Sequence, residues 1–431
     1  MKIRIVGQWN TIIKRFEKYR VYLKSSVLYL GSSVLSAAIS IAINPLMAKN
    51  LSPEDYAIIG YFTSFQLLLL PLLNFNLITY YLRNYYKIPD ERRTIVADTI
   101  LISSLIYGIF SLVVSLFLFS IYFKISKISF DFYPFALVAF LPVLLNNFIN
   151  FYLVNCRLKR EASNYAKLNI TNSVLLATIS IVLVVYFKLG AIGKLNSVLI
   201  VSLFYSAYCF VKSLNKWQFD FSVLKDAIKF SYPLTLSALL WYFFTGYDRA
   251  LLVGLNDNNT LGIYNVGLQI ASILTVFYTA ISQTFEPDIY KAIAENNNNK
   301  LIKLFSAIIG INAIPNILFI VFAPLVIGLL TANRYLESTI FAQIFALRNI
   351  TMSFYYMAIM VVVGYGYTKQ EFIIRLSATI PIIVFMKSLV NNYTFYGAAW
   401  SQVIAFLVLA ILLYIYIHFK LIKQNLLQNV K

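Results

Sequence analysis

Residues 241–254, WYFFTGYDRALLVG, place an acid and a base, Asp248 and Arg249, side by side within an apolar and aromatic run. Each charge costs a few kcal/mol near the middle of a bilayer. Neighbouring residues project about 100° apart on a helix, so the two side chains are predicted to be poor partners for each other. If this run crosses a membrane, each charge needs a partner on another helix or contact with water.

The composition shows that the run belongs to a membrane protein. Of 431 residues, 60% are hydrophobic and 12% are charged, and apolar runs recur over nearly the whole length, as in polytopic membrane proteins. The net charge of +19 could also suit a nucleic-acid binder. Such a protein gathers its bases on one face or tail, whereas here they recur at the ends of apolar runs. Membrane lipids are therefore expected as partners, and nucleic acid is not.

The residues that usually carry enzyme chemistry are scarce. Two cysteines, Cys156 and Cys209, are too few for a disulfide framework and lack metal-ligand spacing, and His418 is the single histidine. No glycine-rich Lys-Ser/Thr loop for cradling a phosphate is present in the sequence. We therefore expect no catalytic residue, no metal and no cofactor, and an energy source other than ATP hydrolysis at such a loop.

Twelve segments reach the length of about 20 mainly apolar residues that a membrane-spanning helix needs. Pro71 and Pro142 are predicted kink points within the longer ones. The predicted spans are 26–46, 55–82, 94–123, 131–153, 164–187, 191–212, 228–253, 260–285, 302–330, 337–364, 372–389 and 396–419.

The distribution of bases predicts that both termini are cytoplasmic. With that orientation 27 of the 36 Lys and Arg fall in cytoplasmic segments and 7 in external connections, as the positive-inside rule requires. The predicted organisation is a basic amphipathic helix over 1–24 in the membrane interface, an N-lobe over 25–215, a C-lobe over 216–420 and a basic tail over 421–431. The fold class is all-α integral membrane protein with two six-helix lobes. Asp98, Glu286 and Asp288, near cytoplasmic span ends, are expected to be solvated.

An internal repeat supports the two lobes. SPEDYAIIGYF, from Ser52, aligns with DNNTLGIYNVG, from Asp257, and LGAIGKLNSVLI, from Leu189, aligns with YGAAWSQVIAFL, from Tyr396. The offsets are 205 and 207 residues, and each stretch opens a span at the equivalent place of its half. Because six is even, the halves share one orientation, which is the parallel-repeat plan of transporters, with the site between the lobes near the bilayer midplane.

Three patches carry a family resemblance: NLSPEDYAIIGYFTSF from Asn50, SYPLTLSALLWYFFTGYDRALLVG with LGIYNVGLQI from Ser231, and GAAWSQVIAF from Gly397. They resemble the polysaccharide transporters of the MOP superfamily, and among these the O-antigen flippases of the Wzx type. The resemblance implies a MATE-like fold that carries a polyprenyl-diphosphate-linked oligosaccharide to the external leaflet of the bacterial inner membrane by alternating access. It also implies H⁺ or Na⁺ coupling in some members, and polysaccharide polymerase machinery as a partner.

Arg348 is the deepest predicted cation. It lies 11 residues past Glu337, about 16 Å along a helix, and so near the middle of a ~30 Å hydrocarbon core. A central arginine should face protein or water, where its guanidinium suits a diphosphate. The alternative is an ion pair or carbonyl contact between helices.

Asp248 and Arg249 lie nearer the external end of the seventh span. Arg249 either faces the cavity or extends to the external interface. Asp248 either binds a coupling cation or serves as a counter-ion to a base on another helix, with Arg348 as one candidate.

Further cavity residues are predicted from helical spacing. Polar side chains in the eighth span keep to one stripe about 27 Å long, which suits a water-filled cavity for sugar hydroxyls or bonding between helices. They are Asn265, Gln269, Ser272, Thr279 and Gln283. Asn44 falls at the repeat equivalent of Arg249 and is predicted to line the same cavity.

The sequence disfavours two other functions. A cation-coupled exporter of small organic cations, of the MATE type, should carry unpaired acids in its spans, whereas the middle parts of these spans hold two bases, Arg249 and Arg348, and only one clear acid. A membrane glycosyltransferase or polymerase needs a substantial external loop, and all the connections here are short. The sequence therefore predicts a transporter with a cationic, polar cavity, and no enzyme.

Overall fold

The computed structural model describes residues 28, 29, 31–126, 128, 130–275, 278, 281, 285, 288, 289, 291–293, 295, 297–365 and 367–428, with the side chains of 420–428 left aside. Within these residues all regular structure is helical, which confirms the predicted fold class. The predicted helix over 1–24 lies outside the described residues. So do the last three residues of the tail.

In the first half, short helices stand among long ones. A helix from Gly31 leads into α2, and α7 continues into a short π-helix, η1. Their bounds are α2 Asn44–Asn50, α3 Pro53–Asn74, α4 Leu77–Asn84, α5 Asp90–Ile125, α6 Phe135–Leu158, α7 Ala162–Ser180, η1 Ile181–Tyr186 and α8 Gly190–Ser213.

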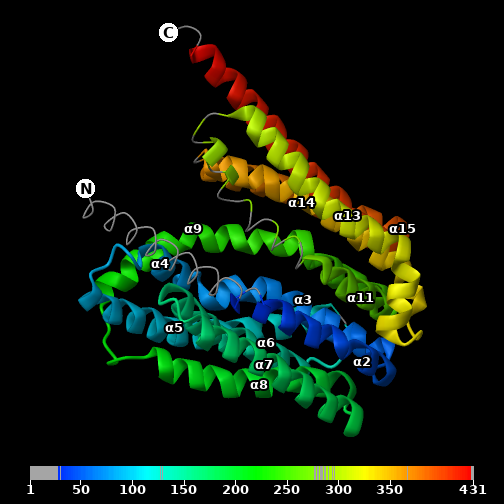
Figure 1. Cartoon of the computed structure of the whole chain (residues 1–431). Coiled ribbons are helices and arrows are strands. Elements are labelled where there is room, and N and C mark those ends of the chain that lie inside the picture. Colours follow the sequence, from blue (N-terminus) through cyan, green and yellow to red (C-terminus); the bar gives the residue numbers. More distant parts are fainter. Residues whose placement is uncertain are drawn as a thin grey trace, which may run out of the picture.

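The second half repeats this alternation of short and long helices. Its bounds are α9 Phe221–Thr245, α10 Tyr247–Leu252, η2 Val253–Leu255, α11 Asn258–Ser272, α13 Asn298–Thr331, η3 Leu336–Ser338, α14 Thr339–Gly364 and α15 Thr368–Gln428. In Figure 1 the blue-to-green helices α2–α8 form one bundle, and α13–α15 form the other. The two bundles converge near α2 and diverge toward the other end.

Nine helices among the described residues are long and apolar enough to cross a membrane. They are Gly31–Asn50, Pro53–Asn74, Asp90–Ile125, Phe135–Leu158, Ala162–Tyr186, Gly190–Ser213, Asn298–Thr331, Leu336–Gly364 and Lys369–Phe419. The last holds two predicted spans, because the backbone turns at Thr394, with φ 50° and ψ −126°. The seventh and eighth predicted spans correspond to α9 with α10 and to α11. The total of twelve stays a prediction.

Where the long helices break differs in part from the prediction. The second span, predicted as one segment with a kink at Pro71, ends four residues later, where Phe75 and Asn76 adopt left-handed conformations with φ 45° and 50°. The amide of Phe75 donates to the carbonyl of Pro71 and closes α3. By contrast α6 continues through Pro142 to Leu158. Proline ends the helix where left-handed residues follow it, and is accommodated where they do not.

Asp98 is not solvated, contrary to the prediction. Its side chain is fully buried in α5, and it holds the connection between the halves. Its Oδ1 accepts from the backbone amide of Asn215 and its Oδ2 from that of Lys216, both at 2.8 Å. The connection has no helical hydrogen bonds of its own here, so its amides need such an acceptor. Of the other two acids, Asp288 is exposed, and Glu286 lies outside the described residues.

The repeat predicted from the sequence is visible in the paired helices α3 and α11. They begin at Pro53 and Asn258, 205 positions apart, and each follows a residue whose side chain accepts a backbone amide of the first turn. Ser52 does so for α3, and Asp257 for α11. The two helices pack against each other.

Glycines allow α3 and α11 to approach closely. A Cβ added at Gly262 would lie 1.9 Å from the carbonyl oxygen of Pro53. A Cβ at Gly60 would lie 2.1 Å from the amide carbon of Asn265. Both contacts join the first half to the second, so they fix how near the halves come together.

We call the end of the molecule where α3 and α11 begin the closed end. It is also held by contacts of the segment between α13 and η3 with α2 and with Leu51. Arg334 Nη1 donates to the carbonyls of Ala48 and Lys49, at 3.2 and 2.5 Å. The Tyr335 hydroxyl donates to the carbonyl of Leu51 at 2.7 Å. Burial raises the pKa of the Tyr335 phenol to about 12, so this hydroxyl keeps its proton at neutral pH.

Candidate functional site

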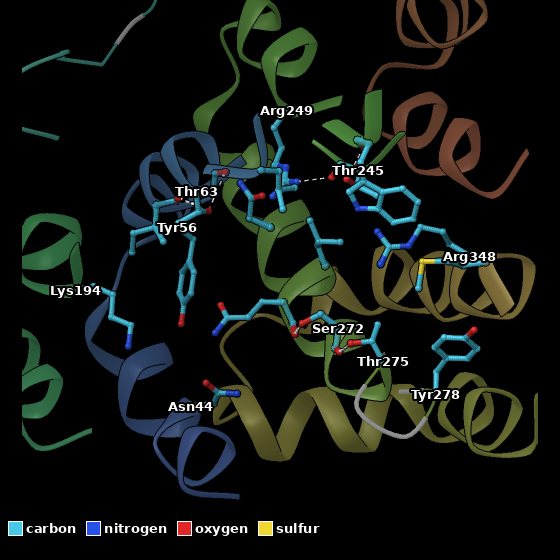
Figure 2. A pocket seen from close by; sticks show the side chains of 18 of the residues that line it. Asn44, Tyr56, Thr63, Lys194, Thr245, Arg249, Ser272, Thr275, Tyr278 and Arg348 are labelled. Carbon is cyan, nitrogen blue, oxygen red and sulfur yellow. Dashed lines mark hydrogen bonds between the residues drawn. The ribbon is translucent and has the colours of Figure 1, made fainter. Parts of the chain in front are cut away.

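A cavity of about 870 Å³ lies between the two halves. Its walls come from α2, α3 and α8 on one side and from α9, α10, α11 and α14 on the other (Figure 2). Its polar or charged lining residues are Asn44, Tyr56, Thr63, Lys194, Thr245, Arg249, Asn265, Gln269, Ser272, Thr275, Tyr278, Arg348 and Tyr356. The volume lies within the range of about 300–1,000 Å³ typical of ligand pockets.

The six residues predicted to line a cavity all line this one. They are Arg348, Arg249, Asn265, Gln269, Ser272 and Asn44. The positions of Thr279 and Gln283, the last members of the predicted stripe, lie outside the described residues. The role of each of these residues in binding substrate stays a prediction.

Arg249 turns inward rather than toward the external interface. Its helix α10 is separated from α9 by Gly246, so the carbonyl of Thr245 at the end of α9 is left without a helical partner. Arg249 Nη2 donates to this carbonyl at 2.6 Å, and the residue is 7% exposed (Figure 2). A cation at a helix C-terminus is stabilised by the helix dipole.

The position of Asp248 contradicts the prediction that Asp248 and Arg249 are poor partners for each other. Its Oδ1 lies 3.6 Å from Nε of Arg249, so the two neighbours do form an ion pair. The break at Gly246 puts them in a six-residue helix, and the long arginine side chain folds back along it. Asp248 is fully buried and its Oδ2 accepts from the Tyr264 hydroxyl at 2.5 Å. Asp248 does not line the cavity.

Arg348 is held by amide side chains, not by Asp248. Its Nη1 donates to Oε1 of Gln402 at 2.8 Å, and its Nη2 to Oδ1 of Asn349 at 3.2 Å. The guanidinium lies 5.0 Å from the centre of the Phe345 ring. No carboxylate of the described residues forms an ion pair with it within 4.0 Å, so its positive charge remains available to a ligand in the cavity.

Lys194 is a third cation in the cavity, and sequence reasoning missed it. It lies near the external end of the predicted span over 191–212, and the positive-inside count places it among the seven bases of the external connections. The structure places its ammonium 3.2 Å from the Ser180 hydroxyl, and the side chain faces the cavity opposite Arg348 (Figure 2). The repeat offered a signal for this placement, because GAIGKLNS, which contains Lys194, aligns with a stretch of the second half that also opens a span.

A smaller cavity of about 290 Å³ adjoins the central one. The two share the lining residues Asn44, Lys194, Gln269 and Ser272. Its other walls come from the helix that begins at Gly31 and from α7. The central site therefore continues sideways between the first span and α11.

The charges lining the central cavity share one sign. Arg249, Arg348 and Lys194 line it, and no Asp or Glu is among its described lining residues. Across the described part of the chain, no group of three or more His, Cys, Asp or Glu has the arrangement that a metal ion requires. The arrangement suits an anion that also carries groups able to bond with amides and hydroxyls.

Comparisons with known proteins agree with this geometry. The profile of a family described as "Polysaccharide biosynthesis protein" matches residues 22–289. Lsg locus putative protein 1 of Haemophilus influenzae is 22% identical over 280 residues, which are 63% of this chain and 67% of that protein. The residues matched by the family profile include the lining parts of α2, α3, α8, α9, α10 and α11, but not those of α14.

Solved structures share the fold at low identity. The lipid II flippase MurJ, in an inward closed conformation, has a TM-score of 0.71 and 14% identity, covering 91% of this chain and 87% of that one. An inward-facing multidrug resistance MATE family transporter of the MOP superfamily gives 0.66 and 18%, covering 91% and 94%. A MOP superfamily transporter from Pyrococcus furiosus, described as having a binding pocket of reverse polarity, has a TM-score of 0.62 and 18% identity, covering 93% of this chain and 95% of that one.

Proposed function

Because the chain belongs to the polysaccharide biosynthesis protein family and has the fold of a multi-pass MOP superfamily transporter, we propose that it is a flippase for lipid-linked oligosaccharides. Its substrate is a polyprenyl-diphosphate-linked oligosaccharide, such as the repeat unit of an O-antigen or a related surface polysaccharide. It moves this substrate from the cytoplasmic to the external leaflet of the bacterial inner membrane, with both of its own termini in the cytoplasm.

One observation carries the proposal: a cavity between the halves holds three cations and no described carboxylate. A diphosphate carries negative charge that must leave water when the headgroup crosses the membrane, and unpaired buried charge is costly. Arg348 and Arg249 offer guanidinium groups able to bind phosphate oxygens in pairs, and Lys194 adds a point charge from the opposite wall.

The sugar part of the substrate is assigned to the polar side of α11. Asn265, Gln269 and Ser272 face the cavity along one stripe. Their amide and hydroxyl groups match sugar hydroxyls as donors and acceptors. Trp241 and Tyr356 also line the cavity, and their rings lie 5.8 Å apart. Such faces suit the apolar faces of sugar rings.

Alternating access is the proposed mode of transport. The closed end joins the halves through the contact of α3 with α11 and through Arg334 and Tyr335, while the bundles diverge at the other end (Figure 1). We assign the diverging end to the cytoplasm, because the described connections there are basic. Substrate would enter in this state, and separation of the closed end would release it outside.

Asp248 is proposed as a structural counter-ion rather than a site for a coupling ion. It is fully buried, it is bonded to Tyr264 and paired with Arg249, and it does not line the cavity. Coupling to H⁺ or Na⁺ and cooperation with polymerase machinery stay predictions. The positive charge of the cavity disfavours an exporter of small organic cations.

The test is reconstitution of the purified protein in liposomes that carry the lipid-linked oligosaccharide in one leaflet. The proposal expects transfer to the other leaflet, a large loss of transfer for Arg348→Gln, and little change for the exposed Arg92→Gln, which is a matched arginine outside the cavity. Transport of a cationic dye without transfer of the oligosaccharide would instead establish the exporter.

A further inference from the structure

A second polar pocket, which we call the end pocket, lies within the first half and apart from the central cavity. Its volume is about 420 Å³, and it is bounded by the neighbouring ends of α4, α5, α6, α7 and α8. It shares no lining residue with the central cavity among the described residues. This is the end at which the connections are basic and which we assign to the cytoplasm.

The end pocket carries cationic side chains that the proposed transport does not use. Arg93, Lys159 and Lys212 line it, against one carboxylate, Glu161. Arg93 is already engaged, because it forms an ion pair with Asp90 and its Nε donates to the carbonyl of Tyr85 at 2.8 Å. The two lysines form no ion pair within 4.0 Å with any described residue. Two ammonium groups therefore face a polar hollow without a fixed counter-ion.

The interior of the end pocket is organised rather than loose. The Tyr81 hydroxyl donates to Oδ1 of Asn155 at 2.8 Å, and the two side chains are 2% and 8% exposed. Ser213 is 6% exposed, and its hydroxyl is buried without a hydrogen-bond partner among the described residues. A buried hydroxyl without a partner is destabilising. The hydroxyl is thus a donor that a ligand entering the pocket would satisfy.

Glu161, the carboxylate in the lining, does not neutralise the two lysines of the end pocket. Glu161 Oε2 accepts from Nδ2 of Asn164 at 2.9 Å, so part of its bonding capacity is used within the pocket wall. Both residues are exposed, and they lie at the start of α7, toward the mouth. The buried members, Asn155 and Ser213, are neutral and can donate hydrogen bonds.

We propose that the end pocket binds a phosphate group. Basic pockets between membrane-spanning helices on the cytoplasmic side are suited to the headgroups of anionic lipids, and the volume is large enough for such a headgroup. The lysines contact the phosphate at the mouth, and the Ser213 hydroxyl donates to an oxygen of the group that enters. The phosphate comes from a membrane lipid, from the diphosphate of a carrier lipid, or from free anion.

Binding of defined probes to the purified full-length protein in detergent tests this proposal. Native mass spectrometry would measure the affinity for short-chain phosphatidylglycerol, for a short polyprenyl diphosphate and for inorganic phosphate. Lys159→Gln with Lys212→Gln is compared with Lys225→Gln with Lys229→Gln, two exposed lysines near the same end on α9 that do not line the pocket.

At about fivefold in affinity for each basic group near an anionic headgroup, the pocket pair should weaken binding by about thirtyfold. The control pair should change it by less than about threefold. Ser213→Ala should weaken binding by about fivefold, which shows that the ligand reaches the interior. The probe that responds most strongly identifies the source of the phosphate.

The proposal is overturned if the pocket pair and the control pair weaken all three probes equally, or if neither pair weakens any of them. Because the measurement involves no transport, a negative result leaves the proposed flippase activity intact. Conversely, a protein that transports nothing could still show this binding.

Discussion

The helices α3 and α11 occupy equivalent places in the two halves, yet they give the cavity different walls. Both begin with a capped turn, at Pro53 and Asn258, and each packs on the other through small residues. The cavity side of α3 is mainly apolar, and that of α11 is polar. The lining residues of α3 are Tyr56, Ile59, Gly60, Thr63 and Leu67, and those of α11 are Asn265, Leu268, Gln269 and Ser272.

The difference shows that the repeat determines where the helices lie, whereas substitutions at equivalent positions determine which side chains line the cavity. Gly60 and Asn265 are equivalent at the offset of 205 and meet at the contact between the helices. Ile43 and Asn44 of the first half correspond to Asp248 and Arg249 of the second. The second half therefore carries the buried ion pair and two of the three cavity cations, and the site is asymmetric.

The largest effect is expected from breaking the ion pair that only the second half carries. Asp248→Ala leaves Arg249 buried without its counter-ion, at a cost of about 3–5 kcal/mol in the free energy of unfolding. Ile43→Ala, at the equivalent position, should cost about 1 kcal/mol. Thermal unfolding of the purified variants would measure both. Equal stability of the two variants would contradict the structural role of Asp248.

The next effect comes from the close approach of α3 and α11. Gly262→Ala puts a methyl group against the Pro53 carbonyl, which is backbone and cannot turn aside, at a cost of about 1–3 kcal/mol. Gly310→Ala is the control, because a Cβ there meets nothing within 4 Å. The control should unfold at or above the wild-type temperature. If both variants unfold at one temperature, the contact does not hold the halves together.

A smaller effect is expected at the equivalent pair Gly60 and Asn265. Gly60→Ala meets a side chain, which can shift, so the expected loss is about 1 kcal/mol. Combining it with Asn265→Ala removes the clash, and the double variant should recover stability relative to the sum of the single changes. Strict additivity in thermal unfolding would show that the two positions do not meet.

The smallest effect is expected at the closed end. Tyr335→Phe removes one hydrogen bond to the Leu51 carbonyl, worth about 0.5–1.5 kcal/mol. It should raise the population open at this end, seen as up to about tenfold faster labelling of a cysteine introduced at Tyr56 on the cavity wall. Tyr133→Phe, on an exposed tyrosine, should leave the labelling rate unchanged. An unchanged labelling rate in Tyr335→Phe would show that this hydrogen bond does not keep the closed end shut.

The long helices and part of the cavity lining could be predicted from the sequence, because they depend on the length of apolar runs and on the helical period. Apolar runs predicted the long helices, and helical spacing placed Asn265, Gln269 and Ser272 on one wall. The pairing of Asp248 with Arg249 could not be predicted from ideal helix geometry, since it depends on the break at Gly246. Lys194 was missed because charge counting assigns a base near a span end to the external connection, although the predicted span over 191–212 contains this residue. In the structure Lys194 lies in α8 and lines the cavity.

The central claim is that the cavity recognises a diphosphate through cations held mainly by the second half. The most direct measurement is the affinity of the purified protein for a polyprenyl diphosphate relative to the matching monophosphate, in wild type and in Arg348→Gln. The account predicts that the wild type prefers the diphosphate and that Arg348→Gln lowers this preference by about tenfold or more. An unchanged preference in Arg348→Gln would contradict it.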